Sequence, residues 1–349
     1  MQNFDFDAPI ERRGTWSAKF DGAAHFGKPE GLLPLWVADM DFPAPPAVKE
    51  ALETCAHFGI FDSYADAVID WYTRRHGWTP RAEWLVKTPG VCVALAMAVR
   101  ALTKEGDGVL IQPPVYYPFA NTIKNNRRTL VESPLVYRDG RYSIDFADFE
   151  AKAADEKVKV FILCNPHNPV CRVWTQEELQ KLGDICHRHG VFVVSDEIHG
   201  DITLTGHAYT PYLRANPTLE SEAIVCTAPS KSFNLAGLQA SNIFIPNADV
   251  RAAFSQEIDA AGLGLLNLMG LVACKAAYTG GEEWLDACLA YMRGNLDYLR
   301  GYLAKNIPGI RLVEPEGTYF AWLDCSALGF AEADALDAFI TDRAGLWLD

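Results

Sequence analysis

Three polar residues stand at the ends of predicted strands and could take part in chemistry: Asn168, Asp196 and Lys231. They follow one another at separations of 28 and 35 residues. An unpaired carboxylate is costly to bury. Asp196 is therefore either the N-cap of a helix, a buried acid that accepts hydrogen bonds, or the partner of a cationic group on a ligand. Most lysines keep their charge in solvent, but a partly buried lysine has a lowered pKa and can attack a carbonyl. Asn168 lies in an Asn-Pro turn, and its amide could also donate to an oxyanion.

Other residues near these positions could complete a binding site. Tyr116 ends another predicted strand, where an aromatic side chain usually packs in the core but could instead stack on a planar ligand. Val91 and Cys92 enter a predicted helix after Gly90, and free N–H groups at a helix start can bind phosphate, to which Ser230 could add a hydroxyl. An amine, a carboxylate, an amide, phosphate donors and an aromatic ring together match what pyridoxal phosphate requires of a protein.

The elements that would position these residues alternate between apolar strands and helices. Apolar strands that end in turns are predicted over residues 108–119, 157–169, 191–201 and 223–233, and helices over 92–104 and 175–190. The second helix has Thr175 as its N-cap, Glu178 three residues later and Gly190 at its end. Strands that are apolar on both faces and alternate with helices predict a three-layer α/β/α fold around a mostly parallel sheet. In such a sheet the ligand site lies at the carboxyl ends of the strands, where the four turns should converge.

The length of 349 residues favours two domains. We expect a large cofactor-binding domain over residues 43–270 and a smaller α+β domain formed by residues 1–42 and 271–349. The last part of the chain predicts, in order, a helical stretch over 271–306 with a bend at Gly280 and Gly281, a two-stranded unit over 309–326 and a helix over 331–345.

Six segments of the chain form a recognisable set: "RRGTWSAKFD", "LPLWVADMDFPAPP", "PPVYYPF", "NPHNPV", "VVSDEIHGD" and "SKSFNLAGLQ". They resemble the motifs of fold-type I pyridoxal-phosphate enzymes in the class I/II aminotransferase family. Within that family "WVADMDF" and "SDEIH" resemble the cystathionine β-lyase, or C–S lyase, subgroup, because typical aminotransferases tend to have tyrosine where His199 stands.

The resemblance implies a role for each matching residue. Lys231 would form the Schiff base with the cofactor and later move a proton, Asp196 would pair with the pyridinium nitrogen, and Asn168 would bind the ring oxygen. The other implied positions are Tyr116 stacked on the ring, Tyr117 beside the substrate, Ala38 near the substrate carboxylate, His199 at the cofactor, and Val91, Cys92 and Ser230 at the phosphate. The resemblance also implies a homodimer, since such active sites borrow residues across the subunit interface.

The chain departs from the family pattern at three places. The subgroup usually has a Gly- and Tyr-rich segment after the position of Phe61, which is missing here, so Tyr64 receives no role. The family's C-terminal arginine binds the substrate carboxylate bidentately, but Arg343 lies too early to match it, and the C-terminal part is expected to be incomplete. Cys171 stands where the family turn often has glycine.

Composition excludes several classes of protein. The net charge of −14 and the absence of a strong basic patch argue against a nucleic-acid partner. The nine cysteines include no C-x-x-C pair, which indicates neither a disulfide framework nor a metal site. No apolar run approaches the ~18 to 20 residues of a membrane span, and the first residues contain no apolar signal region. We therefore expect a soluble cytoplasmic protein with no membrane partner.

The function that these residues predict is that of a C–S β-lyase, which cleaves cystathionine or another cysteine S-conjugate to a thiol, pyruvate and ammonia. An aminotransferase on the same cofactor would use the same residues and stays open as an alternative. A regulatory or binding protein on this fold is the second alternative, because a fold does not fix a function.

Overall fold

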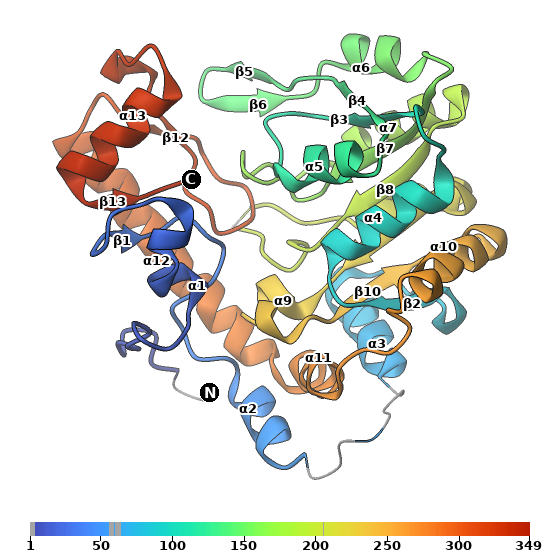
Figure 1. The fold of residues 1–349 in the computed structure, drawn as a ribbon, viewed down its shortest axis with the longest axis horizontal. Helices are drawn as coiled ribbons and strands as arrows, with labels where there is room; N and C mark the ends of the chain where they lie inside the picture. The colour runs from blue at the N-terminus through green and yellow to red at the C-terminus, as the bar shows by residue number, and fades with distance from the viewer. Residues whose placement is uncertain (1–3, 56–58, 60–63, 205) are drawn as a thin grey trace.

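The structure is a computed structural model that describes residues 4–55, 59, 64–204 and 206–349. At its centre lies a seven-stranded sheet (Figure 1). In spatial order its strands are β2 (Leu85–Thr88), β10 (Ser241–Phe244), β9 (Ala223–Thr227), β8 (Phe192–Asp196), β7 (Val158–Cys164), β3 (Gly108–Ile111) and β4 (Thr129–Glu132). The five strands from β9 to β4 pair in parallel, whereas β10 is antiparallel to both of its neighbours. The predicted mostly parallel sheet is confirmed.

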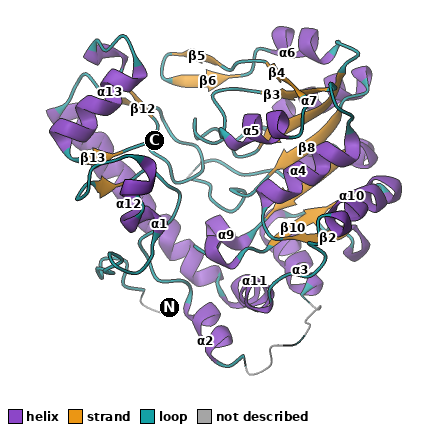
Figure 2. Ribbon diagram, in the orientation of Figure 1, coloured by secondary structure: helices purple, strands orange, loops and turns teal. Residues whose placement is uncertain are grey.

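Helices cover both faces of this sheet, which confirms the three-layer architecture (Figure 2). Side chains alternate along β7: Val160 and Ile162 join one core cluster, and Phe161 and Leu163 join the other. The first cluster includes residues of α4 (Val91–Leu102), α5 (Pro118–Asn125) and α10 (Ala248–Ala260). The second includes residues of α3 (Ala65–His76), α6 (Phe146–Ala153), α7 (Gln176–His189), α8 (Tyr212–Ala215) and α11 (Leu268–Gly280). Both faces of the sheet are therefore buried, as continuous apolar strands require.

Local sequence signals account for the ends of several helices. The Thr175 side chain accepts from the Glu178 N–H and Gly190 follows α7 with a φ of 65°, so the predicted capping box and helix end are confirmed. The predicted bend near Gly281 separates α11 from α12 (Glu282–Asn306). The predicted last helix is shorter, because α13 (Ala333–Phe339) gives way to a π-helical turn over Ile340–Ala344.

The remaining elements are short. They are α1 (Ala18–Asp21), α2 (Pro46–Glu53), α9 (Pro229–Ser232), the hairpin of β5 (Val136–Arg138) and β6 (Arg141–Ser143), and the predicted two-stranded unit of β11 (Arg311–Leu312) and β12 (Leu323–Asp324). The sequence patterns did not predict the parallel pairing of β1 (Leu33–Pro34) with β13 (Leu346–Trp347), which joins the two ends of the described chain. Within the described ranges no helix is both long and apolar enough to cross a membrane.

A segment near the C-terminal end crosses back to the edge of the large sheet. The Glu316 carboxylate accepts from the Arg172 Nε at 2.8 Å and from the Val173 N–H at 2.9 Å. Arg172 is only 2% exposed, and Glu178 is its second ion-pair partner, at 3.0 Å. Two carboxylates thus offset the cost of burying one guanidinium, and they join residues far apart in the sequence.

Cys171 also joins this segment to the sheet. Its backbone has a φ of 61°, a left-handed conformation that suits the glycine of the family turn. Its carbonyl accepts from the N–H groups of Glu316 and Gly317, and its buried thiol donates to the Pro169 carbonyl at 3.1 Å. The departure at this position therefore falls in a packed contact, where burial raises the pKa of the thiol to about 11.

We predict that Glu316→Ala lowers the free energy of unfolding by about 3 to 5 kcal/mol, because it leaves the buried Arg172 with an incomplete set of partners. Urea unfolding followed by circular dichroism measures the change. Glu314→Ala is the matched control, because Glu314 pairs with Arg300 on the surface and should cost about 1 kcal/mol or less. Equal losses in the two variants would contradict the role given to Glu316.

Candidate active site

The register of the parallel strands brings the predicted residues to one edge of the sheet. Cys164 pairs with Asp196, and Asp196 pairs with Cys226, so β7, β8 and β9 end together. Asn168 lies in the turn after β7, Asp196 is the last residue of β8, and Lys231 lies in α9, which follows β9. The parallel sheet thus places the turns that carry all three residues at the edge where ligands bind in such folds.

Lys231 is mostly buried, and its amine already has a defined partner. Its Nζ donates to the Ala38 carbonyl at 3.0 Å, so the predicted substrate-side residue lies beside the predicted nucleophile. Burial lowers the pKa of Lys231, and the opposing influence of Cys92, Asp39 and Asp196 does not restore it. A lysine in this setting keeps a larger neutral fraction than one in solvent, which is what a nucleophile or base needs.

Asp196 is a buried carboxylate with few partners. It is 5% exposed and accepts from the Ile198 N–H at 3.1 Å. Burial raises the pKa of Asp196 to about 7, against the lowering influence of that hydrogen bond and of the Lys231 charge. No cationic side chain within the described ranges forms an ion pair with it in the structure. The site therefore offers a buried acid that a cationic ring nitrogen would complete.

His199 adds a second buried group without a partner. It is 2% exposed, and its Nδ1 makes no hydrogen bond to any described residue. Burial and, as the smaller cause, the Lys231 charge together lower the pKa of His199 to about 3, so the ring is neutral. The rings of Tyr319 and Phe320 pack edge-on against it at centroid distances of 5.9 and 5.5 Å. An orphaned ring nitrogen beside Lys231 fits a site that binds a polar group.

The start of α4 provides backbone donors. Gly90 precedes the helix with a φ of 140°, which side chains rarely allow, and no side chain caps the helix in the part of the chain described. Thr88 donates to the Gly90 carbonyl at 3.1 Å and fixes this turn. The N–H groups of Val91 and Cys92 consequently have no helical acceptor and could bind an anion.

Asn168 and Tyr116 are neighbours through the backbone. The Tyr116 N–H donates to the Asn168 carbonyl at 3.1 Å, and both residues are half-buried. Burial raises the pKa of Tyr116, whose hydroxyl interacts with the Cys92 thiol, so Tyr116 also lies near the start of α4. Tyr117 is 60% exposed, with its ring 5.6 Å from that of Tyr116. Ser230 is half-buried and directly precedes Lys231.

A clamp that the sequence analysis did not identify holds the loop that carries Ala38. Asn234 donates through Nδ2 to the carbonyls of Met40 and Phe42 at 2.9 and 3.2 Å, and its Oδ1 accepts from the Met40 N–H at 3.0 Å. Its φ of 56° is one that asparagine tolerates. The only sequence signal was its place in the motif "SKSFNLAGLQ".

Two cations fix the other side of this loop. Arg12 pairs with Asp39 at 2.5 Å, and the buried Lys19 pairs with Asp41 at 2.7 Å and donates to the Asp39 carbonyl at 2.8 Å. Both cations belong to the motif "RRGTWSAKFD", whose role the sequence left open. The loop beside the Lys231 amine is therefore attached to the N-terminal segment as well as to Asn234.

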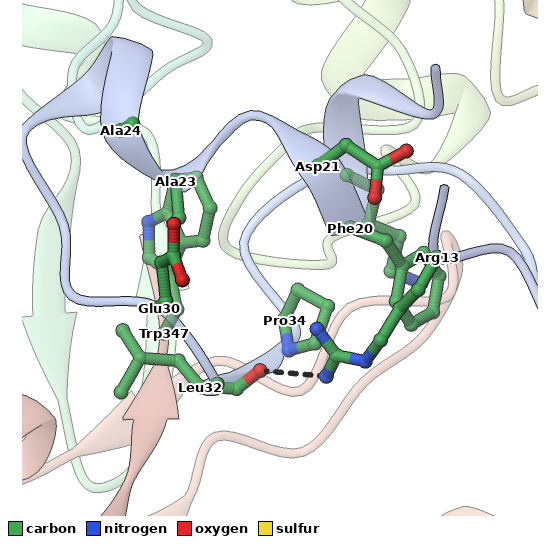
Figure 3. Close-up of a pocket in the computed structure, with 11 residues that line it drawn as sticks. Arg13, Phe20, Asp21, Ala23, Ala24, Glu30, Leu32, Pro34 and Trp347 are labelled. Atoms are coloured by element: carbon green, nitrogen blue, oxygen red, sulfur yellow. Dashed lines mark hydrogen bonds between the residues drawn. The ribbon is translucent and has the colours of Figure 1, made fainter. Parts of the chain in front are cut away.

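A separate cavity of about 270 Å³ lies between the N-terminal segment and Trp347 (Figure 3). Arg13 donates across it to the Leu32 carbonyl at 3.2 Å. None of the predicted site residues lines this cavity.

Two departures from the family pattern concern the segment before Tyr64 and the position of Arg343. The expected gap after Phe61 lies outside the described residues. Tyr64 is buried just before α3, and Arg343 is exposed in the turn after α13.

Comparison with known proteins identifies the family. The model of the family described as aminotransferase class I and II matches residues 37–348, so the chain belongs to this family. The chain is 45% identical to "Cystathionine beta-lyase PatB" of Bacillus subtilis over 336 residues, which are 95% of this chain and 87% of that protein.

Solved structures agree with this assignment. The crystal structure of cystalysin from Treponema denticola, which contains a pyridoxal 5'-phosphate cofactor, has a TM-score of 0.95 and 37% identity over 100% of this chain and 90% of its own. The PLP-bound C-S lyase from Staphylococcus hominis has a TM-score of 0.91 and 34% identity over 99% and 89%. The predicted family and its resemblance to the C–S lyase subgroup are confirmed.

We predict that Asp196 destabilises the cofactor-free protein at high pH. Its folded pKa of about 7 lies above the ordinary 3.8, so the stability present at low pH is lost as pH rises through 7. The free energy of unfolding of Asp196→Asn, taken relative to that of the native protein, should rise by about 2 to 3 kcal/mol as the pH goes from about 5 to about 8. Urea unfolding of both proteins, each without cofactor, measures this difference. A gap that does not change with pH would contradict it. The two proteins are compared because burial also raises the pKa of Glu197 to about 7, and the contribution of Glu197 is common to both and cancels in the difference.

Proposed function

We propose that the chain is a pyridoxal-phosphate-dependent C–S β-lyase that cleaves cystathionine or a related cysteine S-conjugate to a thiol, pyruvate and ammonia. The observation that carries this proposal is that a mostly buried amine and a buried carboxylate without a cationic partner among the described residues lie at the same sheet edge: Lys231, whose pKa is lowered, and Asp196, whose pKa is raised. The names of the cystathionine β-lyase PatB and of the C-S lyase from Staphylococcus hominis support the same activity, and cystalysin supports the cofactor.

The residues of the site fit the cofactor group by group. Lys231 would bond to its carbonyl carbon, and Asp196 would pair with its ring nitrogen, for which a buried carboxylate without a cationic partner is suited. Asn168 and His199 would face its ring oxygen side, and Tyr116 would stack on the ring. The N–H groups of Val91 and Cys92, with the Ser230 hydroxyl, would bind its phosphate.

The chain's own residues would carry the proton steps. When bound, pyridoxal phosphate supplies an electrophilic carbon and a ring that accepts electrons. The Lys231 Nζ would take the proton from the substrate α-carbon, a role that its lowered pKa favours at neutral pH. The Ala38 carbonyl, 3.0 Å from Nζ, would hold the free amine on the substrate side. Loss of the β-sulfur as a thiolate, and addition of one water, balances the reaction to thiol, pyruvate and ammonia.

The same residues could support amino-group transfer, so the distinction from an aminotransferase depends on the product. Tyr117, exposed beside Tyr116, is the proposed substrate contact from the turn just before α5, and Ala38 is the one from the N-terminal loop. The lyase names of relatives at 34 to 45% identity favour elimination. A regulatory role remains a prediction that the sequence alone suggested.

We also propose that the chain forms a homodimer in the cytoplasm. Its large domain would comprise residues 43–270, and its small domain residues 1–42 and 271–349. An apolar groove beside the Lys231 loop, formed by Pro43, Val48, Leu52, Leu235 and their neighbours, supports a second copy as its cover. No disulfide forms among the cysteines of the described residues, which suits a reducing compartment. The strands of the large sheet all fall within 43–270, which supports the division.

We predict that the purified protein with added pyridoxal phosphate releases pyruvate and a thiol from cystathionine. Lys231→Ala should lower this rate by about 10³-fold or more, because it removes both the nucleophile and the base. Lys104→Ala, at an exposed lysine just beyond the C-terminal end of α4 and so far from the Val91 end that faces the site, is the control and should keep full activity. Lactate dehydrogenase coupling measures pyruvate, and a thiol reagent measures the second product. Accumulation of a pyridoxamine form without thiol would instead favour the aminotransferase.

We predict that sedimentation equilibrium gives a mass twice the 38.6 kDa of the chain. Leu265, which is 76% exposed in the loop between α10 and α11, should contact the second copy. Leu265→Glu is expected to shift the protein toward monomer because it would bury a charge in an apolar contact. A native protein that sediments as a monomer at micromolar concentration would contradict the proposed assembly.

A further inference from the structure

A buried polar cluster that the proposed mechanism does not use lies next to Lys231. Its centre is Asp201, in the turn after β8. The Asp201 carboxylate accepts from Ser232 Oγ at 2.7 Å through Oδ2, and from Trp71 Nε1 at 2.9 Å through Oδ1. His76 Nε2 lies 2.7 Å from the same Oδ1. Three elements thus meet at one carboxylate: α3 through Trp71 and His76, the turn after β8, and α9 through Ser232.

Asp201 is equipped to stay ionised although it is buried. It is 5% exposed, and burial alone would raise its pKa, but the hydrogen bond and charge of His76, together with the Ser232 and Trp71 donors, lower it below its ordinary value. Asp196, five positions earlier in the same turn region and equally buried, has a raised pKa instead. The difference follows from the partners, because Asp201 has three side-chain donors whereas Asp196 accepts from one backbone N–H.

The contact with Ser232 acts on the element that carries Lys231. Ser232 is completely buried and directly follows Lys231 in α9, a helix of four residues that has no side-chain cap in the described structure. So short a helix cannot fix its own orientation, because most helical stability in proteins comes from packing. Asp201 holds α9 from the core side, and Asn234 holds the chain that follows it against the Met40 loop. Between these two contacts the Lys231 amine reaches the Ala38 carbonyl.

We infer that Asp201 is a positioning residue for Lys231. By accepting the Ser232 hydroxyl on a carboxylate anchored to α3, it fixes the turn of α9 that aims the Lys231 amine at the substrate side of the site. This inference rests on the proposed lyase function for its catalytic consequence. Its structural part, the placement of the Lys231 amine, does not depend on that function.

The test uses Ser232→Ala, which removes the hydroxyl and leaves Asp201 with its other two donors. Ser195→Ala is the matched control, because the buried Ser195 hydroxyl also donates to a buried carboxylate at 2.7 Å, and that carboxylate belongs to Glu197 rather than to the Asp201 that holds α9. Each change removes one hydrogen bond of the same kind, so the two variants should lose similar stability. A difference between them therefore reports on the position of Lys231.

The first measurement is made on the cofactor-free protein. Acetylation of Lys231 is followed by mass spectrometry as a function of pH. Burial lowers the pKa of Lys231, so a loosened α9 should admit water and move the labelling midpoint upward, toward that of an exposed lysine. We expect this upward shift in Ser232→Ala and Asp201→Asn and no shift in Ser195→Ala. An unchanged midpoint in Ser232→Ala would overturn the inference, even if Asp201→Asn fails to fold.

The second measurement is made on the protein loaded with pyridoxal phosphate, with cystathionine that carries deuterium at the α-carbon. A misplaced base should lower kcat by about 10- to 100-fold with little change in KM, and should enlarge the isotope effect because proton removal becomes slower. Ser195→Ala should change neither. Equal isotope effects in Ser232→Ala and the native enzyme would overturn the catalytic part. If the native protein released no pyruvate, the proposed function would fail while the labelling comparison still decided the placement of Lys231.

Discussion

Parallel pairing of β7, β8 and β9 determines where chemistry can occur in this chain. These strands are buried on both faces, and their register aligns Cys164 and Asp196, the last residues of β7 and β8, with Cys226, the residue before the last of β9. Polar side chains can meet a ligand without entering the core only where such strands end. The turns that carry Asn168, His199 and Lys231 all begin at this edge, so their proximity is a consequence of the sheet rather than of any local signal.

The turn region after β8 shows how partners decide the state of a buried acid. Asp196 accepts from one backbone N–H, so its carboxylate can still bind a ligand. Asp201 instead accepts from side chains of α3 and α9, so its carboxylate binds only other parts of the protein. Both carboxylates are 5% exposed, so burial cannot explain the opposite directions of their pKa shifts. One acid is available to a cofactor, and the other stabilises the frame that surrounds it.

Segments distant in the sequence complete the site from outside the sheet. The loop of Ala38 reaches Lys231 because Asn234, Arg12 and Lys19 hold it there. The segment of Glu316 returns to the same edge and brings the Tyr319 and Phe320 rings against His199. The Arg172–Glu316 pair is buried on both sides and the N-terminal pairs are partly exposed, and together these contacts tie both ends of the chain to the turns of the central sheet.

The sequence by itself determined the layer architecture, the family and the types of residue at the strand ends. Apolar runs in alternation with capped helices identify the parallel core, and the order Asn168, Asp196, Lys231 identifies the chemistry. It did not predict the antiparallel β10, the pairing of β1 with β13, or the Asn234 and Asp201 contacts, since each joins residues whose separation in the chain carries no periodic signal. Only the tertiary structure decided that Asp196, and not Asp201, is left without a cationic partner among the described residues. It also decided that the Lys231 amine faces the Ala38 carbonyl. The physical reason is that pKa and orientation depend on burial and on partners from other elements, which are set when the chain packs.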